Sequence, residues 1–240
     1  MKSHANILFL FFGLFFVSCE ATNEETNGLT APETAGASQT EQGNSSSGTT
    51  DPDETSAAVE ATITNLMAAY AGETTASAKY AAYAQKATAE GHPRLALLFK
   101  ATSRSERIHA DNHRAVLEEM GKDIPEITPQ FTVVTSKENL TDAIAGESYE
   151  IATMYPEFLT AANTADNQLA LVSFNYAYKT EMKHKPLYEN ALALLLTNQL
   201  ETLPNQYLMC PTCGNTYDGI APKRCRISMT DGNRFIKITA

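Results

Sequence analysis

Four long segments carry apolar residues at intervals of three and four, the spacing that predicts amphipathic α-helices. They cover about residues 55–90, 93–120, 136–162 and 166–202. Ionisable side chains fall within the apolar stripes, where a solvated helix would not place them. The four stripes are Leu66, Tyr70, Glu73, Ser77, Tyr80 and Ala84; Leu95, Phe99, Thr102, Glu106, His109, Val116 and Met120; Leu140, Ile144, Glu147, Ile151, Met154 and Phe158; and Phe174, Tyr178, Glu181, His184, Leu187 and Leu195.

The connections alternate between short and long. Gly91-His92-Pro93 and residues 163–166 are tight turns, whereas residues 122–135 form a long link that contains two prolines and a short β-like run at 131–134. A helix of 28 residues is roughly 42 Å long and a 14-residue link spans about 46 Å. We therefore expect two antiparallel helical hairpins joined by a lengthwise crossover. Pro156 should interrupt the third helix, and Pro186 should distort the fourth.

The two hairpins carry the same chemistry. Glu106-x-x-His109 recurs 75 positions later as Glu181-x-x-His184, and an Ala-Gly-Glu triplet ends at both Glu73 and Glu147. Residues three apart share a helix face, so each Glu and His pair points the same way. A Glu from two helices and a Glu-x-x-His from two others form the di-metal site of ferritin-like bundles. Buried carboxylates without metal, the alternative, would require compensation of several kcal/mol each.

The first 53 residues differ in composition from the helices. Residues 5–17 are apolar but too short to span a bilayer, which is typical of a signal peptide. The tetrapeptide that ends at Cys19 has the pattern of a bacterial lipobox, with Cys19 lipidated. Residues 20–53 have no aromatic residue and predict a disordered tether. Residues 1–19 and 20–53 thus predict an exported lipoprotein anchored in the cell envelope; the alternative is a fortuitous, uncleaved apolar N-terminus.

Periodicity stops after residue 202, and residues 203–240 form a separate tail. Cys210-Pro-Thr-Cys213 is a knuckle typical of zinc and iron sites, and Cys225 begins a second one in which Ser228 takes the fourth position. Three thiols and a hydroxyl offer an incomplete tetrahedral set for an iron or zinc ion; Asp231 or water are alternatives to Ser228. The formal net charge of -10 and pI of 5.0 argue against nucleic acid as a partner.

Together these motifs resemble the rubrerythrin family from about residue 55 to the C-terminus. Those that carry the resemblance are Ala-Gly-Glu-Thr at 71–74, Glu-Arg-Ile-His at 106–109, Ala-Gly-Glu-Ser-Tyr-Glu at 145–150, Met-Tyr-Pro-Glu-Phe at 154–158, Glu-Met-Lys-His at 181–184, and the Cys-Pro-Thr-Cys-Gly knuckle at 210–214. The resemblance implies a mainly α protein: a ferritin-like four-helix bundle with a long crossover over residues 54–202. A small Cys-knuckle, rubredoxin-like β domain would follow over residues 203–240.

The resemblance also implies a role for each residue of the motifs. Glu106 and Glu181 would bridge two non-haem irons, with terminal ligands Glu73, His109, Glu147, Glu150 and His184. One iron would exchange Glu150 for His109 on reduction, and Tyr80 and Tyr155 would hydrogen-bond the ligands; for these tyrosines the alternative is an ordinary core position. His92 and His113 have no counterpart, and His113 is predicted to lie at the rim of the bundle.

The implied activity is the reduction of hydrogen peroxide to water in oxidative-stress defence. Electrons would come from an unidentified donor through the rubredoxin-like centre, in many members of the family on the partner subunit of a head-to-tail homodimer. Ser228 departs from the family pattern of four cysteines, and this departure supports an alternative. The chain would then be a ferroxidase or iron-sequestration protein of the cell envelope with no peroxidase role.

Overall fold

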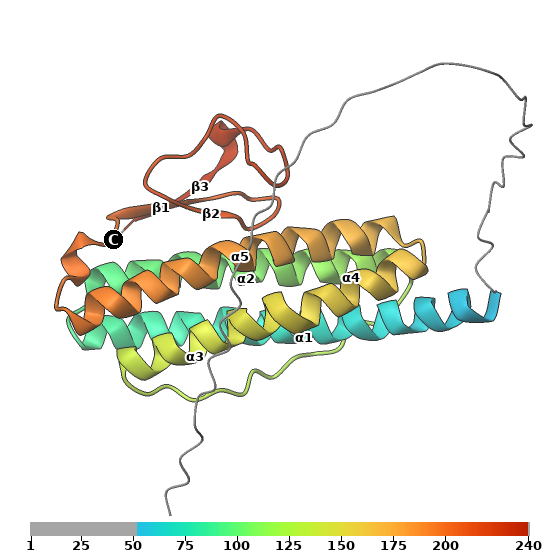
Figure 1. Ribbon diagram of the computed structural model, residues 1–240, viewed down its shortest axis with the longest axis horizontal. Coiled ribbons are helices and arrows are strands. Elements are labelled where there is room, and N and C mark those ends of the chain that lie inside the picture. The colour runs from blue at the N-terminus through green and yellow to red at the C-terminus, as the bar shows by residue number, and fades with distance from the viewer. Residues whose placement is uncertain (1–51, 240) are drawn as a thin grey trace, which may run out of the picture. The chain divides into compact units, whose positions relative to one another are not determined.

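The computed structural model describes residues 52–239, so the predicted signal peptide, Cys19 and most of the tether lie outside the described residues. The described chain is mainly helical and ends in a small region of strands (Figure 1). Its helices are α1 (Pro52–Ala89), α2 (Pro93–Glu119), α3 (Ser136–Tyr149), the π-helical turn η1 (Glu150–Met154), α4 (Tyr155–Thr164), α5 (Gln168–Leu196) and the 3-10 turn η2 (Leu200–Thr202). None of the described helices is both long and apolar enough to cross a bilayer.

Local sequence explains where the first hairpin turns. Gly91 has a φ of 80°, a left-handed conformation that glycine adopts without steric penalty. Pro93 occupies the first turn of α2, where its missing N–H would have no partner in any case. A second tight connection joins α4 to α5, and a long link joins α2 to α3, so the predicted pattern of connections is present.

The link between α2 and α3 runs along the length of the bundle in Figure 1, as the crossover topology requires. The expected β-like run at 131–134 was wrong, because these residues have no regular secondary structure. Phe131, Val133 and Val134 are exposed, and no strand of the described chain pairs with them. The link ends in a capping box, in which the side chains of Thr135 and Glu138 each bond the other's backbone N–H.

The third long helix changes its winding immediately before Pro156. α3, η1 and α4 follow one another without a break, and the N–H of Tyr155 bonds the carbonyl of Glu150 across the wider π turn. Proline at 156 has no N–H to continue the ladder, so the extra residue of the π turn absorbs the interruption predicted from the sequence. α5 is capped by Asn167 and continues through Pro186.

Two apolar clusters fill the bundle. One contains Tyr80, Phe99 and Tyr188 with aliphatic residues of α2 and α3, and the other contains Leu66, Tyr155 and Phe174. Each cluster contains one tyrosine whose hydroxyl donates a hydrogen bond to a buried carboxylate. The polar residues of the bundle therefore lie between two apolar regions, where water has little access.

The C-terminal strands form an antiparallel sheet in the order β2-β1-β3. They are β1 (Gln206–Met209), β2 (Thr216–Asp218) and β3 (Ile236–Thr239), with the 3-10 turn η3 (Gly232–Arg234) before β3. The three thiols of Cys210, Cys213 and Cys225 form the centre of this tail. The tail also contacts its own bundle, since Ser105 and Asn112 of α2 and Thr180 of α5 donate hydrogen bonds to its carbonyls.

Candidate metal centre

Six buried side chains meet between the helices. Their possible ligand atoms form two groups, and within each group the atoms lie within 4.8 Å of one another. Glu106 and Glu181 belong to both groups, which is the arrangement that two bridging carboxylates would give. One group is Glu73, Glu106, His109 and Glu181, and the other is Glu106, Glu147, Glu181 and His184.

The Glu-x-x-His spacing places each histidine between the two shared carboxylates. Nδ1 of His109 lies 2.8 Å from Glu181 and 3.0 Å from Glu106. Nδ1 of His184 lies 2.7 Å from Glu181 and 3.1 Å from Glu106. One pair lies on α2 and the other on α5, so the two Nδ1 atoms approach the same carboxylates from two helices.

These side chains suit a pair of cations. Eight of their nitrogen and oxygen atoms are buried and make no hydrogen bond to any group outside the cluster: Glu73 Oε2, both carboxylate oxygens of Glu106 and Glu181, Glu147 Oε2, and Nδ1 of both histidines. Burial raises the pKa of Glu73 to about 7 and, with neighbouring carboxylates, raises the pKa of Glu147 well above its usual range. Divalent ions would supply the positive charge that stabilises these buried carboxylates in their ionised form.

The outer nitrogen of each histidine is held by the tail. His109 Nε2 lies 3.1 Å from the Cys213 carbonyl, which only accepts, so this nitrogen carries the proton. His184 Nε2 lies 3.2 Å from the Thr216 hydroxyl, which donates its own proton to the Gly214 carbonyl. Burial alone would lower the pKa of each histidine, but the facing carboxylates raise the pKa of His184 to about 10 and that of His109 well above its usual range. Because the tail holds a proton on each Nε2, a bound metal ion would replace the proton on Nδ1.

Gly214 allows this close approach. Its φ is 77°, and a Cβ there would lie 2.6 Å from both His109 Nε2 and Ser105 Oγ. A local sequence pattern does not show which loop will cover a histidine, so the sequence did not predict these contacts. The glycine directly after Cys213 showed only that the backbone there could approach another group closely.

Two buried tyrosines donate hydrogen bonds to carboxylates of the cluster. Tyr80 donates to Glu147 at 3.0 Å, and Tyr155 donates to Glu73. A hydrogen bond to the charged carboxylate favours ionisation and fixes one oxygen. The structure thus places both predicted tyrosines against the residues that the sequence predicted as terminal ligands.

Glu150 is the predicted ligand that lies outside both groups. It begins the π turn, one turn beyond Glu147, and its side chain is partly buried. Burial and the nearby Glu73 raise its pKa well above the usual range for a carboxyl group. π turns are frequent at functional sites, where the added residue changes the direction of a side chain.

The predicted position of His113 at the rim was wrong. His113 is fully buried, and its ring lies against Tyr155 and Phe174. It follows His109 by one turn on the same face of α2, which was the available signal. Its neighbours on α4 and α5 are distant in sequence, so the pattern of α2 alone could not show that they enclose it.

The tail brings together all four residues singled out from its sequence. Cys210, Cys213 and Cys225 are buried and free, with Cys213 Sγ 3.4 Å from Cys225 Sγ. Ser228 Oγ lies 3.2 Å from Cys210 Sγ. Their thiol sulfurs form a group that could hold a metal ion, with the serine hydroxyl beside it.

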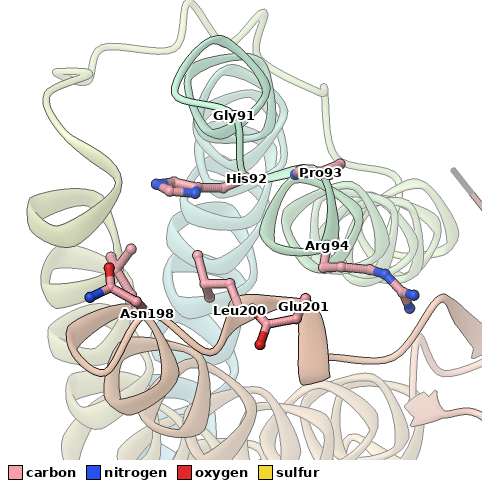
Figure 2. Close-up of a pocket in the computed structure, with 8 residues that line it drawn as sticks. Gly91, His92, Pro93, Arg94, Asn198, Leu200 and Glu201 are labelled. Atoms are coloured by element: carbon pink, nitrogen blue, oxygen red, sulfur yellow. The ribbon is translucent and has the colours of Figure 1, made fainter.

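A surface cavity of about 400 Å³ lies elsewhere, where the α1–α2 turn meets the segment after α5 (Figure 2). His92, Arg94, Asn198 and Glu201 line it, and none of the clustered carboxylates or histidines does. The candidate chemistry is therefore in the interior of the bundle and not in this cavity.

A four-helix bundle with a long crossover, carboxylates from four helical segments and two Glu-x-x-His pairs defines the ferritin-like di-metal class. Within that class, the sequence model of the family described as Rubrerythrin matches residues 64–192. The chain belongs to the rubrerythrin family, whose members bind non-haem di-iron.

Two relatives show how far the similarity extends. Nigerythrin of Nitratidesulfovibrio vulgaris is 33% identical over 181 residues, which are 74% of this chain and 87% of nigerythrin. Rubrerythrin-2 of Clostridium acetobutylicum is 35% identical over 171 residues, covering 71% of this chain and 92% of the relative. A solved structure of nigerythrin in a mixed-valent state matches with a TM-score of 0.66 at 32% identity, covering 73% of this chain and 86% of nigerythrin.

Proposed function

We propose that this protein is a di-iron oxidoreductase that reduces hydrogen peroxide to water. The observation that carries the proposal is the pair of four-residue groups that share Glu106 and Glu181, with one histidine in each whose Nε2 is held by the tail. A solved structure of the relative nigerythrin is of its fully reduced, all-ferrous state, which supports iron as the metal. A pair of iron(II) ions would supply the two electrons that, with two protons, convert one peroxide molecule to two of water.

The side chains have distinct roles in this proposal. Glu106 and Glu181 would bridge the ions, Glu73 and His109 would complete one position, and Glu147 and His184 the other. Tyr80 and Tyr155 would each fix the orientation of the carboxylate that they hydrogen-bond. His109 belongs to one group and Glu150 lies outside both, so Glu150 would be the carboxylate that exchanges with His109 in the way implied by the family.

The tail would deliver electrons to this centre. Cys213 belongs to the thiol group, and its carbonyl accepts a hydrogen bond from His109. A rubredoxin-like iron held by Cys210, Cys213, Cys225 and Ser228 would therefore be connected to a ligand of the bundle through one hydrogen bond. An external donor, still unidentified, would reduce the tail.

A second candidate function is ferroxidase or iron sequestration without peroxidase activity. Ser228 favours it, because a hydroxyl binds iron less readily than a thiolate and would weaken the electron route. Anaerobic loading with iron(II), followed by stopped-flow mixing with hydrogen peroxide or dioxygen, tests both functions. The peroxidase proposal predicts that peroxide oxidises the protein much faster than dioxygen does. Equal rates, or faster oxidation by dioxygen, would contradict it and favour the ferroxidase.

A further inference from the structure

A buried chain of hydrogen bonds leads away from the metal centre. Tyr155 donates to Glu73, His113 Nε2 lies 3.2 Å from the Tyr155 hydroxyl, and His113 Nδ1 lies 2.8 Å from Ser173 Oγ. None of these four side chains is more than 4% exposed. The chain therefore joins α1, α4, α2 and α5 without contact with bulk water.

The chemistry of the groups fixes the direction of these bonds when Glu73 holds a metal. An ionised carboxylate only accepts, so the Tyr155 hydroxyl uses its single proton on Glu73. The Tyr155 oxygen must then accept from Nε2–H of His113, which leaves Nδ1 to accept from Ser173. Burial lowers the pKa of His113 to about 3, so the ring is neutral and one tautomer satisfies every contact.

The duplicated half of the bundle has no such chain. A shift of 75 positions takes Tyr155 back to Tyr80, Ser173 back to Leu98, and His113 forward to Tyr188. Tyr80 donates to Glu147, but the Tyr188 hydroxyl donates to Thr102 and not to Tyr80. Each half holds its terminal carboxylate with a tyrosine, and only one half supports that tyrosine with a histidine and a serine.

We propose that His113 is a positioning residue for one of the two metal positions. Ser173 holds its ring in the Nε2–H tautomer, and this nitrogen orients the Tyr155 hydroxyl toward Glu73. Glu73 belongs to the group that contains His109 and not to the group that contains His184. Loss of His113 should therefore weaken one metal position and leave the other unchanged. The inference rests on the metal centre and is independent of the oxidant.

Cobalt(II) titration of the metal-free full chain tests this role, because binding is followed without catalysis. The absorption of carboxylate- and histidine-bound cobalt reports the bundle, and thiolate charge-transfer bands report the tail separately. His113→Phe keeps a buried ring and removes both hydrogen bonds. We expect it to weaken one of the two bundle ions by about tenfold or more. His113→Gln, whose amide N–H is able to donate to Tyr155, should recover part of the loss. Tyr188→Phe, at the duplicated position, is the matched control and should change neither ion.

A double-variant cycle shows whether His113 acts through Tyr155. We expect His113→Phe combined with Tyr155→Phe to bind cobalt no more weakly than Tyr155→Phe alone, because the tyrosine hydroxyl is then already absent. In zinc-loaded protein, nitrogen NMR should show His113 protonated at Nε2 in the wild type and a mixture of tautomers in Ser173→Ala. Additive losses in the double variant, equal weakening of both ions, or no weakening would each overturn the role of His113. Failure of the wild type to bind two cobalt ions in the bundle would contradict the metal centre itself.

Discussion

At the scale of single residues, the centre depends on which nitrogen of each histidine carries the proton. The tail determines this, since Cys213 and Thr216 hold the outer nitrogens of His109 and His184. Fixing the tautomer through the nitrogen that does not bind metal is a general feature of histidine ligands. Here the tail that holds the thiols also supplies those contacts, so the two candidate metal sites are structurally linked.

Gly214→Ala should weaken this link. The new Cβ would lie 2.6 Å from His109 Nε2, so the tail or the histidine must shift. Gly219→Ala is the matched control: Gly219 also has a positive φ, but a Cβ there meets nothing within 4 Å. Both variants carry a similar backbone strain, so we expect Gly214→Ala to lower the free energy of unfolding by about 1–3 kcal/mol more than its control. Equal denaturation midpoints for the two variants would contradict the close approach.

At the scale of elements, the π turn η1 separates Glu150 from the clustered ligands. The exchange proposed for Glu150 and His109 requires a carboxylate that lies close to the centre but belongs to neither ligand group. Glu150, at the start of this turn, has such a position. Glu150→Ala should therefore slow peroxide turnover by about tenfold or more while the iron content stays near that of the wild type. Glu157→Ala, an exposed carboxylate on α4, is the control. Unchanged turnover in Glu150→Ala would favour the iron-handling alternative.

The tail departs from the family pattern of four cysteines at one position. Ser228 lies beside Cys210, in the place where the family pattern expects a fourth thiol. A neutral hydroxyl must lose a proton to bind ferric iron well, which thiols do far more readily near neutral pH. We expect the wild-type tail to hold iron in less than full amount, and Ser228→Cys to bind it tightly with the charge-transfer bands of an iron tetrathiolate. Full tail iron with tetrathiolate-like bands in the wild type would contradict this expectation.

Sequence periodicity could predict the helices and the residues that meet between them because both follow from local spacing. Glu106 and His109 share a helix face whatever surrounds them. The position of His113 could not be predicted in this way, because its burial depends on Tyr155 and Ser173, which lie far along the chain. The extended residues 131–134 have strand composition, but a strand also requires a partner, and the described chain provides none.

At the scale of the whole molecule, the bundle and tail of a single chain already bring the thiol group and the buried carboxylates into one structural unit. The homodimer implied by the family resemblance stays a prediction. So does export, which depends on residues 1–19, outside the described part of the chain.

Export is tested by changing the predicted lipidation site. Cys19→Ala should release the protein from membranes, since the lipid predicted on Cys19 would be the anchor. The measurement is the share of protein in the membrane and soluble fractions, with Ser18→Ala as the control. A Cys19→Ala variant that stays in the membrane fraction would show that the anchor is something else.

The central claim is that the buried carboxylates and histidines hold two irons, and the iron content of Glu106→Ala tests it most directly. Glu106 belongs to both four-residue groups, so its loss should affect both ions. After anaerobic loading with iron(II) and removal of unbound metal, the wild type should retain about two irons in the bundle. Glu118→Ala, an exposed carboxylate on the same helix, should retain the same amount, and Glu106→Ala should lose nearly all of it. Full iron content in Glu106→Ala would contradict the di-iron centre.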